Sequence, residues 1–289
     1  MTRINLDAVD ARILLLPEFE RLELVLVGCG GTGSWLAPHV ARIARLFHDL
    51  NGKDLQVTFI DKDRVEEKNT YRQNFVPAEI GHDKAETLAM RYSLSTGCSI
   101  AALAKPFAAS DCSKHSSENT LRVFIGCVDN PAARRELERT IKRAEWRTFC
   151  ILLDCGNHMR SGQVIVGTTP VEDMKPFKHF PGYCTWLPKP SVWHKDLITE
   201  TEAEEKKKKK KKPVSEMSCA EIAMMDQQGL SVNAAIAAFA ADYLVQILLT
   251  QNLNRFATYI DLDGMITHRY ITPRVIRRKH LKDSLRGAY

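Results

Sequence analysis

The feature of this 289-residue chain that most constrains its fold is the stretch LVLVGCGGTGS at residues 24–34, where four glycines follow a run of Leu and Val. The apolar run at 22–29 predicts a buried parallel strand, and apolar residues at helical spacing predict a helix over 33–50. Glycines between a strand and a helix allow a tight turn and let backbone N–H groups approach a phosphate at the helix N-terminus. The loop therefore predicts a nucleotide site, but the loop alone does not say which nucleotide.

Strands and helices alternate through the first half of the chain. Further strands are predicted at 55–61, 121–130 and 149–157, and helices at 82–96 and 131–144. A strand at 162–168 follows so soon after 149–157 that the two should be antiparallel.

The pattern changes after residue 168. Six prolines and a lysine run fall between 169 and 216, which is typical of a long crossover segment. An alanine-rich helix at 231–250 is apolar on most faces and should be buried on the sheet. A hairpin is predicted at 255–272 with its turn at Asp263 and Gly264. Together these elements predict an α/β fold, a Rossmann-like doubly wound and mostly parallel sheet with antiparallel strands in the C-terminal half.

The net charge of +6 comes from two local segments, the Lys206 to Lys212 run and the C-terminal tail. A run of one charge is typical of a solvated linker, so we expect nucleic acid to bind only nonspecifically, through the basic tail. No apolar run approaches the roughly 20 residues of a membrane span, and the start MTRINLDAVD lacks the core of a signal peptide. We expect a cytoplasmic protein with no membrane partner.

Eight cysteines are scattered along the chain, and no two form a Cys-x-x-Cys pair. Structural zinc sites usually take their ligands from two close pairs, so we expect no zinc and reduced, mostly buried thiols.

A series of ordered motifs follows the second predicted strand. Asp-x-Asp-x-Val-Glu stands at 61–66, Asn69 follows, Arg-Gln-Asn-Phe stands at 72–75 and Gly-x-x-Lys at 81–84. CVDNPAAR then places Asp129, Asn130 and Arg134 after a later strand. In this order the motifs resemble the adenylating domain of ubiquitin-like-protein activating enzymes, the superfamily of the bacterial ThiF and MoeB proteins, over residues 20–168. The resemblance implies a bacterial adenylyltransferase that binds ATP and Mg²⁺.

The chemistry of adenylation assigns a role to each of these residue types. An enzyme of this kind holds ATP, shields the charge on its phosphates and admits a carboxylate in line with the α-phosphorus. Asp61 is placed to accept hydrogen bonds from the ribose, with a solvated loop acid as the alternative. Arg72 and Lys84 suit the phosphates. Asp129 suits magnesium, with a cap on the helix near Pro131 as the alternative.

The predicted nucleotide-binding set adds the glycine loop and the polar residues that the resemblance places near ATP. These residues are Gly28, Gly30, Gly31, Gly33, Asp63, Asn69, Gln73 and Asn130. Arg72, Lys84, Asp129 and Cys184 form the predicted catalytic set, and Asp129 is the predicted metal ligand.

Two cysteines are candidates for a thioester with the adenylated partner. Cys184, in GYCTWLPKP, resembles the thioester-forming segment of activating enzymes. Cys219 opens a predicted helix, whose N-terminus would favour the reactive thiolate. The stretch SCAEIAMMDQQGL also resembles ThiF-related proteins of the bacterial PRTRC gene cassettes. We favour Cys184 over Cys219, against the alternative that both thiols are inert and buried.

The chain departs from the superfamily near its start. Its members usually carry an Arg-Gln pair there that reaches the ATP of the partner subunit in a symmetric dimer, whereas this chain reads DAVDARILLLPEF with only Arg12 as a substitute. A homodimer is one expectation, but the motif by which the partner would complete the site is absent.

We therefore predict an adenylation half at 1–168, a crossover loop with the lysine insertion at 169–230, a helix and hairpin at 231–272 that complete the same domain, and a basic tail at 273–289. The predicted function is ATP-dependent adenylation of the C-terminal carboxylate of a small ubiquitin-like or sulfur-carrier protein, followed or not by thioester formation. A nicotinamide-dependent oxidoreductase and a non-catalytic nucleotide-binding scaffold are the alternatives.

Overall fold

The computed structural model describes residues 6–112, 119–142, 148–169, 181–199 and 219–276, with side chains of the last segment from 231 onward. The Lys206 to Lys212 run and most of the basic tail lie outside the described residues.

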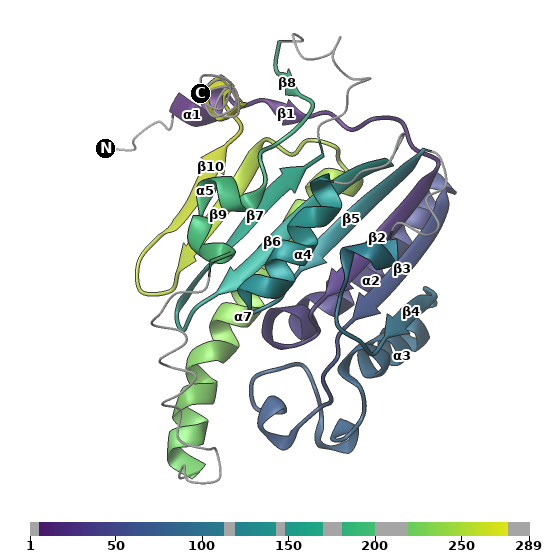
Figure 1. The fold of residues 1–289 in the computed structure, drawn as a ribbon, viewed down its shortest axis with the longest axis vertical. Coiled ribbons are helices and arrows are strands. Elements are labelled where there is room, and N and C mark those ends of the chain that lie inside the picture. The colour runs from purple at the N-terminus through teal and green to yellow at the C-terminus, as the bar shows by residue number, and fades with distance from the viewer. Residues whose placement is uncertain (1–5, 113–118, 143–147, 170–180, 200–218, 277–289) are drawn as a thin grey trace, which may run out of the picture.

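A single eight-stranded sheet forms the centre of the fold (Figure 1), in the order β10-β9-β7-β6-β5-β2-β3-β4. Its strands are β2 Arg21–Val27, β3 Asp54–Ile60, β4 Ile100–Leu103, β5 Thr120–Gly126, β6 Thr148–Asn157, β7 Ser161–Thr168, β9 Arg255–Asp261 and β10 Ile266–Tyr270. The strands from β4 to β6 are parallel neighbours, whereas β7, β9 and β10 are antiparallel to their neighbours. The predicted mostly parallel sheet with an antiparallel C-terminal half is confirmed.

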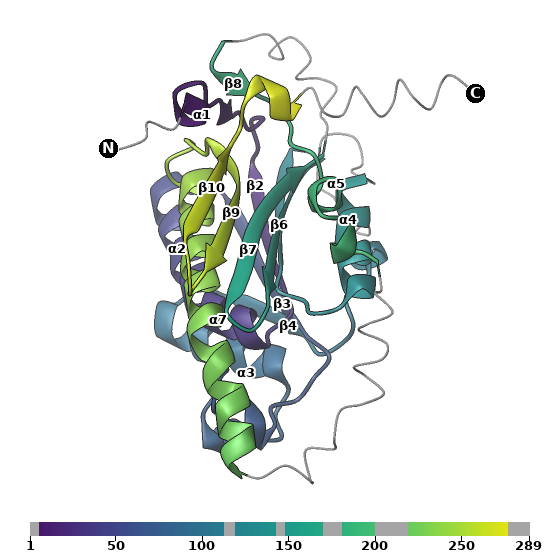
Figure 2. The same ribbon diagram turned by 90° about the vertical axis from the view of Figure 1, so that its left-hand side faces the viewer.

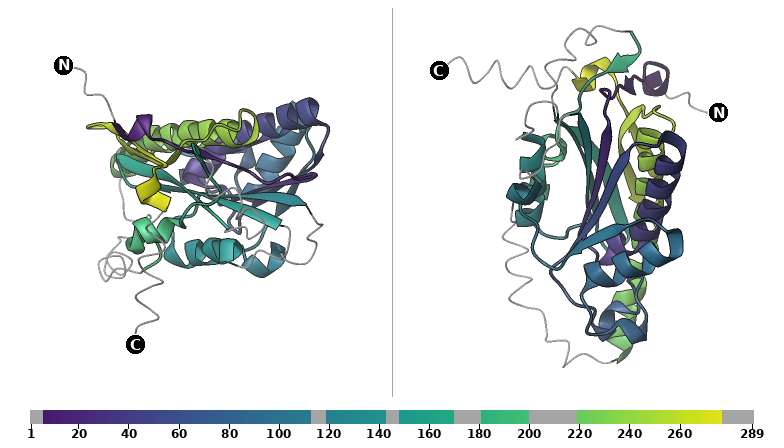
Figure 3. Two further views of the ribbon diagram at one scale, coloured as in Figure 1. Left: turned by 90° about the horizontal axis from the view of Figure 1, so that it is seen from above. Right: turned by 90° about the vertical axis from the view of Figure 1, so that its right-hand side faces the viewer.

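Helices cover both faces of this sheet, as a doubly wound fold requires. They are α1 Leu6–Val9, α2 Gly31–Asn51, α3 Lys84–Thr96, α4 Pro131–Lys142, α5 Pro190–Trp193 and α7 Cys219–Leu248, with short 3₁₀ helices η1 Glu67–Asn69, η2 Pro77–Glu79, η3 Ala109–Cys112 and η5 Lys195–Leu197. Figures 2 and 3 show α2, α3 and α7 on one face and α4 with α5 on the other. Each predicted helix of the first half is present at close to its predicted bounds.

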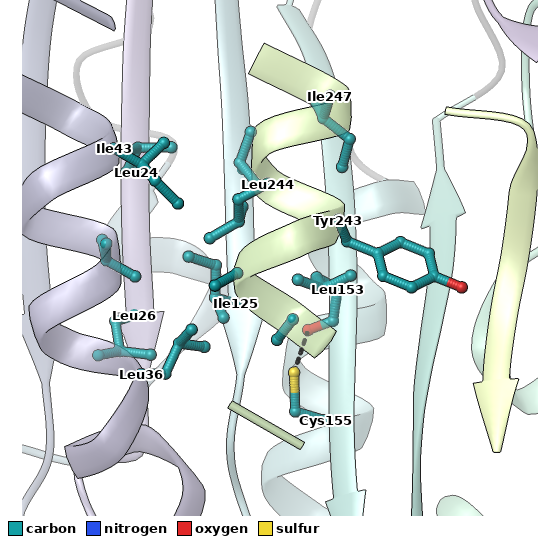
Figure 4. Packing of buried hydrophobic residues seen from close by; sticks show 14 of the residues in the cluster. Leu24, Leu26, Leu36, Ile43, Ile125, Leu153, Cys155, Tyr243, Leu244 and Ile247 are labelled. Carbon is teal, nitrogen blue, oxygen red and sulfur yellow. Dashed lines mark hydrogen bonds between the residues drawn. The ribbon is translucent and has the colours of Figure 1, made fainter. Parts of the chain in front are cut away.

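The main core lies between the sheet and the α2–α7 layer (Figure 4). Leu24 and Leu26 of β2 pack with Ile125 and Leu153 of the neighbouring strands, and the two helices supply Leu36, Ile43, Leu244 and Ile247. Burying one such side chain contributes about 1.5–3 kcal/mol. The packing of α2 in this layer holds its N-terminus at one edge of the sheet.

Helix α7 begins at Cys219, where a helix was predicted to open, and continues without a break through the helix predicted at 231–250. Its window Ser231–Leu248 is the one stretch among the described residues long and apolar enough to cross a membrane. More than half of that window is buried inside the fold, where α7 packs on α2 and on the sheet. Tyr243 is fully buried and its hydroxyl pairs with Thr258 Oγ1 at 2.9 Å. The apolar character of α7 is thus that of a core helix, as predicted.

A second, two-stranded sheet joins β1 Ile13–Leu14 to β8 Tyr183–Cys184 in parallel. The sequence pattern did not predict it. The N-terminal segment is held further by hydrogen bonds from Arg12 N to Ile271 O and from Leu14 N to Leu253 O, at 2.7 and 2.8 Å. Figure 1 shows this pair above the main sheet, while the start of α7 lies below it.

The described part of the crossover, residues 181–199, is anchored on α4 by a buried acid. Glu138 accepts hydrogen bonds from Ser191 N and Ser191 Oγ, both at 2.7 Å, and pairs with Lys189 Nζ at 3.1 Å. The backbone of Lys189 also lies so close to Gly167 that a Cβ there would be 2.8 Å from its Cα. This part of the crossover is thus fixed between α4 and β7.

Candidate functional site

The glycine loop lies between the end of β2 at Val27 and the start of α2 at Gly31. Gly28 has a φ of +89°, and a Cβ there would lie 2.6 Å from Cys127 O. A Cβ on Gly33 would lie 1.8 Å from Gly28 O. Both positions therefore require glycine, and the free N–H groups of the first turn of α2 face the carboxyl edge of the parallel strands, the position expected for a bound phosphate.

Asp61 follows β3 and holds the glycine loop in place. Its Oδ2 accepts a hydrogen bond from Cys29 N at 2.6 Å, and its Oδ1 accepts one from Asp63 N at 2.8 Å. Burial raises the pKa of Asp61, and the two backbone hydrogen bonds and the charge of Lys84 act in the opposite direction. The carboxylate thus lies beside the loop where a ribose would bind, and each oxygen keeps a free lone pair.

Lys84 is the first residue of α3 and is only 6% exposed. Its backbone N–H donates to Asp63 O at 3.0 Å, and its charge lowers the pKa of both Asp61 and the Cys29 thiol. Burial nevertheless raises the pKa of Cys29 well above its usual value, which makes that thiol a poor nucleophile. A nearly buried ammonium next to a glycine loop is suited to a phosphate.

The loop after β3 carries Asn69, Arg72 and Gln73. Asn69 is buried and shapes this loop, because its Oδ1 accepts from Glu66 N at 2.9 Å and its carbonyl accepts from Gln73 N at 2.8 Å. The carbonyl of Arg72 accepts a hydrogen bond from Trp35 Nε1 of α2 at 3.1 Å, which ties the loop to the helix behind the glycines.

Gln73 faces the start of α2. Its Nε2 lies 3.9 Å from the place that a Cβ on Gly30 would occupy. Its Oε1 is buried and has no hydrogen-bond partner among the described residues. Because an unsatisfied buried oxygen is costly, this amide is suited to a ligand at the glycine loop.

Asp129 and Asn130 lie between β5 and α4. The sequence left two roles open for Asp129, magnesium binding and capping of α4. Asn130 Oδ1 accepts a hydrogen bond from Ala133 N at 2.9 Å and so caps α4. The Asp129 carboxylate is exposed at the same edge as the glycine loop, and its Oδ1 accepts a hydrogen bond from Asn130 Nδ2 at 3.5 Å.

A magnesium ion at this edge would have few protein ligands. Among the described residues no three His, Cys, Asp or Glu side chains lie together as a metal cluster. A single carboxylate fits Mg²⁺ that is otherwise bound by phosphate oxygens and water.

A buried acid that no sequence motif indicated lies beside the last residue of β5. Asp154 of β6 is 2% exposed, and burial raises its pKa to about 6 against the opposing charge of Arg134. Arg134 Nε lies 3.6 Å from Asp154 Oδ2, and Asp154 Oδ1 has no hydrogen-bond partner among the described residues. An acid inside the apolar run FCILLDCGN was the signal that could have identified it.

An open cavity of about 520 Å³ lies on the antiparallel half of the sheet. It is lined by Ser161, Gly162, Gln163, Tyr259, Ile260, Asp261, Gly264, Met265 and Thr267. Gln163 Nε2 and Arg134 Nη2 both approach Gly156, at 2.7 and 2.9 Å from the place that a Cβ would take. A cavity residue and a residue of α4 therefore both lie over Gly156, near the end of β6.

Cys184, the predicted nucleophile, lies away from these residues. It is 3% exposed in β8, and burial raises its pKa to about 12. The crossover next to it is bonded to Thr168, which pairs with Ile151 near the start of β6, so β8 lies at the amino edge of the parallel strands. Seven-residue strands separate the two edges by about 20 Å.

Arg12, the possible substitute for the missing Arg-Gln pair, is also remote from these residues. Arg12 lies at the same amino edge, where its Nη1 is 3.4 Å from Tyr183 O, so it does not reach the glycine loop of its own chain. Cys219 is the first residue of α7, and its side chain lies outside the described residues.

The sequence profile of the ThiF family matches residues 14–282 of the chain, and no curated protein sequence matches it. Among solved structures, E. coli MccB with succinimide is 18% identical with a TM-score of 0.51, covering 87% of this chain and 65% of MccB. MccB with AMPCPP and MccA is 17% identical with a TM-score of 0.51, covering 86% and 64%. MccB with ATP is 16% identical with a TM-score of 0.51, covering 87% and 64%. The chain thus shares the MccB fold and spans just under two thirds of its length.

Proposed function

The chain belongs to the ThiF family, and from that premise we propose that it is an ATP-dependent enzyme that adenylates the terminal carboxylate of a peptide or small protein. More specifically, we propose as its substrate the C-terminal carboxylate of a ubiquitin-like or sulfur-carrier protein. The MccB structures with ATP and with MccA support ATP and a peptide as the kind of substrate pair to test.

One observation carries the proposal: the glycine loop, Asp61, Lys84, Gln73 and Asp129 come from separate segments and meet at one edge of the sheet. In the proposed reaction, an oxygen of the acceptor carboxylate attacks the α-phosphorus of ATP. The bond to the β-phosphate oxygen breaks, and the products are an acyl-adenylate and pyrophosphate.

The side chains have separate tasks in that step. The N-terminus of α2 and Lys84 bind phosphate oxygens, and Asp61 orients the ribose. The Gln73 amide is positioned to bond the nucleotide at Gly30. Asp129 would hold Mg²⁺, which when bound neutralises charge on the phosphates.

The acceptor would enter on the α4 face. Gln163 and Tyr259 line the cavity, and the side chains of Gln163 and Arg134 both lie over Gly156. A guanidinium is well suited to recognise a carboxylate. This direction brings the carboxylate toward Asp129 and the glycine loop.

The thioester step does not follow from the described geometry. Cys184 is buried at the opposite edge with a pKa of about 12, and the Cys29 thiol is also buried. We therefore propose that the reaction of this chain ends at the acyl-adenylate, with transfer to Cys219 as the prediction to test against it.

The decisive measurement is exchange of labelled pyrophosphate into ATP in the presence of candidate carrier proteins or peptides. Acceptor-dependent exchange that is lost in Lys84→Met supports adenylation. Binding of NAD without ATP binding would favour the oxidoreductase. ATP binding without exchange for any acceptor would favour the scaffold.

A further inference from the structure

Asn233 is a buried amide in the otherwise apolar middle of α7, within the sequence SVNAAIAAFAADYLVQIL. Its side chain is 3% exposed, and its neighbours along the helix supply the core. A buried amide in such a helix costs free energy unless its polar atoms are bonded, so its partners indicate why the position is polar.

Those partners are two segments of the candidate site. Asn233 Oδ1 accepts a hydrogen bond from Thr32 Oγ1 of α2 at 3.2 Å and another from Asn157 Nδ2 at the end of β6. The two bonds use both lone pairs of one oxygen. Thr32 lies in the first turn of α2, directly after the glycine loop, and Asn157 is the last residue of β6.

The same amide also limits the residue at Gly31. A Cβ on Gly31 would lie 2.9 Å from both Asn233 Nδ2 and Asn233 Oδ1, closer than real Cβ atoms approach such atoms. The backbone at the first residue of α2 is therefore packed directly on Asn233. The amide therefore contacts the start of α2 and the end of β6 at once.

We propose that Asn233 is a positioning residue that fixes the glycine loop relative to the end of β6, and so aligns the ATP α-phosphate with the acceptor carboxylate. The part of this inference that concerns the acceptor carboxylate rests on the proposed function. The part that concerns the glycine loop depends only on ATP binding there. Small displacements of reacting groups cost large factors in rate, which is why a residue behind the site can matter.

The first test is Asn233→Ala, with ATP affinity measured by titration calorimetry and exchange measured at saturating ATP. We expect ATP to bind about tenfold more weakly, the effect of losing one buried hydrogen bond at the loop. We expect exchange at saturating ATP to fall by a further factor of about ten, because the loop and β6 are no longer bonded through one atom. Thr32→Val removes one of the two bonds and should weaken ATP binding by less than Asn233→Ala.

Tyr243→Phe is the matched control, because it also removes a buried polar group from α7, but at a hydroxyl that bonds Thr258 away from the loop. It should lower the melting temperature while leaving ATP affinity and exchange unchanged. Equal effects of the two variants on ATP affinity would show a general loosening of α7 and overturn the inference.

The contact with Gly31 gives a second test by compensation. Gly31→Ala alone should weaken ATP binding strongly, because its methyl group meets the Asn233 amide. The double variant with Asn233→Ala should bind ATP more tightly than Gly31→Ala alone, since the smaller side chain leaves room. Absence of this recovery contradicts the proposed packing.

The outcomes separate this inference from the proposed function. ATP binding without any exchange in the wild type would end the adenylation proposal, while the titrations would still decide the role of Asn233 at the loop. Normal exchange in the wild type together with unchanged ATP affinity and exchange in Asn233→Ala would overturn the inference alone.

Discussion

Charged side chains at the two edges of the parallel strands differ in how they are paired. At the amino edge, Glu23 pairs with Arg21 and with Arg122, and Arg21 also pairs with Asp54, so these charges satisfy one another. At the carboxyl edge, Arg134 pairs with Asp154, but Lys84 and Asp129 form no ion pair among the described residues. Charges that pair with one another support the fold, and charges kept apart beside a glycine loop are ready for a ligand.

The largest expected effect tests this difference directly. Lys84→Met and Asp129→Ala should each lower carrier-dependent pyrophosphate exchange by about 100-fold to 1,000-fold, since each removes charge stabilisation during the reaction. Arg21→Met, at the amino edge, should leave exchange unchanged and lower the free energy of unfolding by about 1 kcal/mol or less. Comparable exchange losses in all three variants would remove the functional distinction between the edges.

The second effect concerns Asp154, whose pKa is raised from 3.8 to about 6 by burial. The folded protein holds this proton more tightly than the unfolded chain, so the group favours folding most below about pH 4. Its contribution is lost as the pH rises through 6, which amounts to about 3 kcal/mol at most. Urea unfolding of wild type and Asp154→Asn from pH 4 to 7 should show the wild type losing stability relative to the variant. If the stabilities of the two proteins changed with pH in parallel, Asp154 would not be the group that titrates.

A third prediction compares two buried thiols at opposite edges. Cys29→Ser and Cys184→Ser should each lower the free energy of unfolding by about 1–2 kcal/mol, because a hydroxyl is harder to bury than a thiol. Only Cys29→Ser should raise the KM for ATP, since Cys29 lies in the glycine loop. An ATP-dependent, reductant-sensitive adduct with a carrier protein that disappears in Cys184→Ser would contradict this separation, and one that disappears in Cys219→Ser would assign the thioester to α7.

The smallest expected effect is that of deleting Lys206 to Lys212. A block of like charges cannot bury apolar surface, so unfolding and pyrophosphate exchange should remain those of the full chain. Nonspecific binding to nucleic acid should decrease, and that difference should vanish at high salt. Loss of exchange on deletion would mean that the run contributes to the site.

Local patterns predicted much of the carboxyl edge. The glycines of 24–34 and the motif residues Asp61, Lys84 and Asp129 follow predicted strands or open predicted helices, and parallel strands necessarily bring such positions to one edge. The antiparallel turn after 149–157 was also a local signal. These features were predictable because each depends on neighbours in the sequence.

The parts that were not predicted depend on contacts between distant segments. A two-residue strand such as β1 has no periodicity, so neither its pairing with β8 nor the location of Cys184 could be predicted from the sequence. In the sequence, Asn233 is one residue of an alanine-rich helix, and its hydrogen bonds to Thr32 and Asn157 are seen only in the folded chain. The ion pair of Arg134 with Asp154 likewise joins α4 to β6 across the face of the sheet.

The β1–β8 pair has a consequence for the order in which the molecule assembles and opens. Arg12 and Tyr183 are 171 positions apart, and two residues on each strand provide little to offset the entropy of closing so long a loop. A two-stranded ribbon is marginal without a finished surface beneath it. We therefore expect this pair to form after the main sheet and to open before it, so that the amides of Ile13 and Leu15 exchange with deuterium long before those of β5. Release of the N-terminal segment would then free one end of the crossover while the nucleotide edge stays folded.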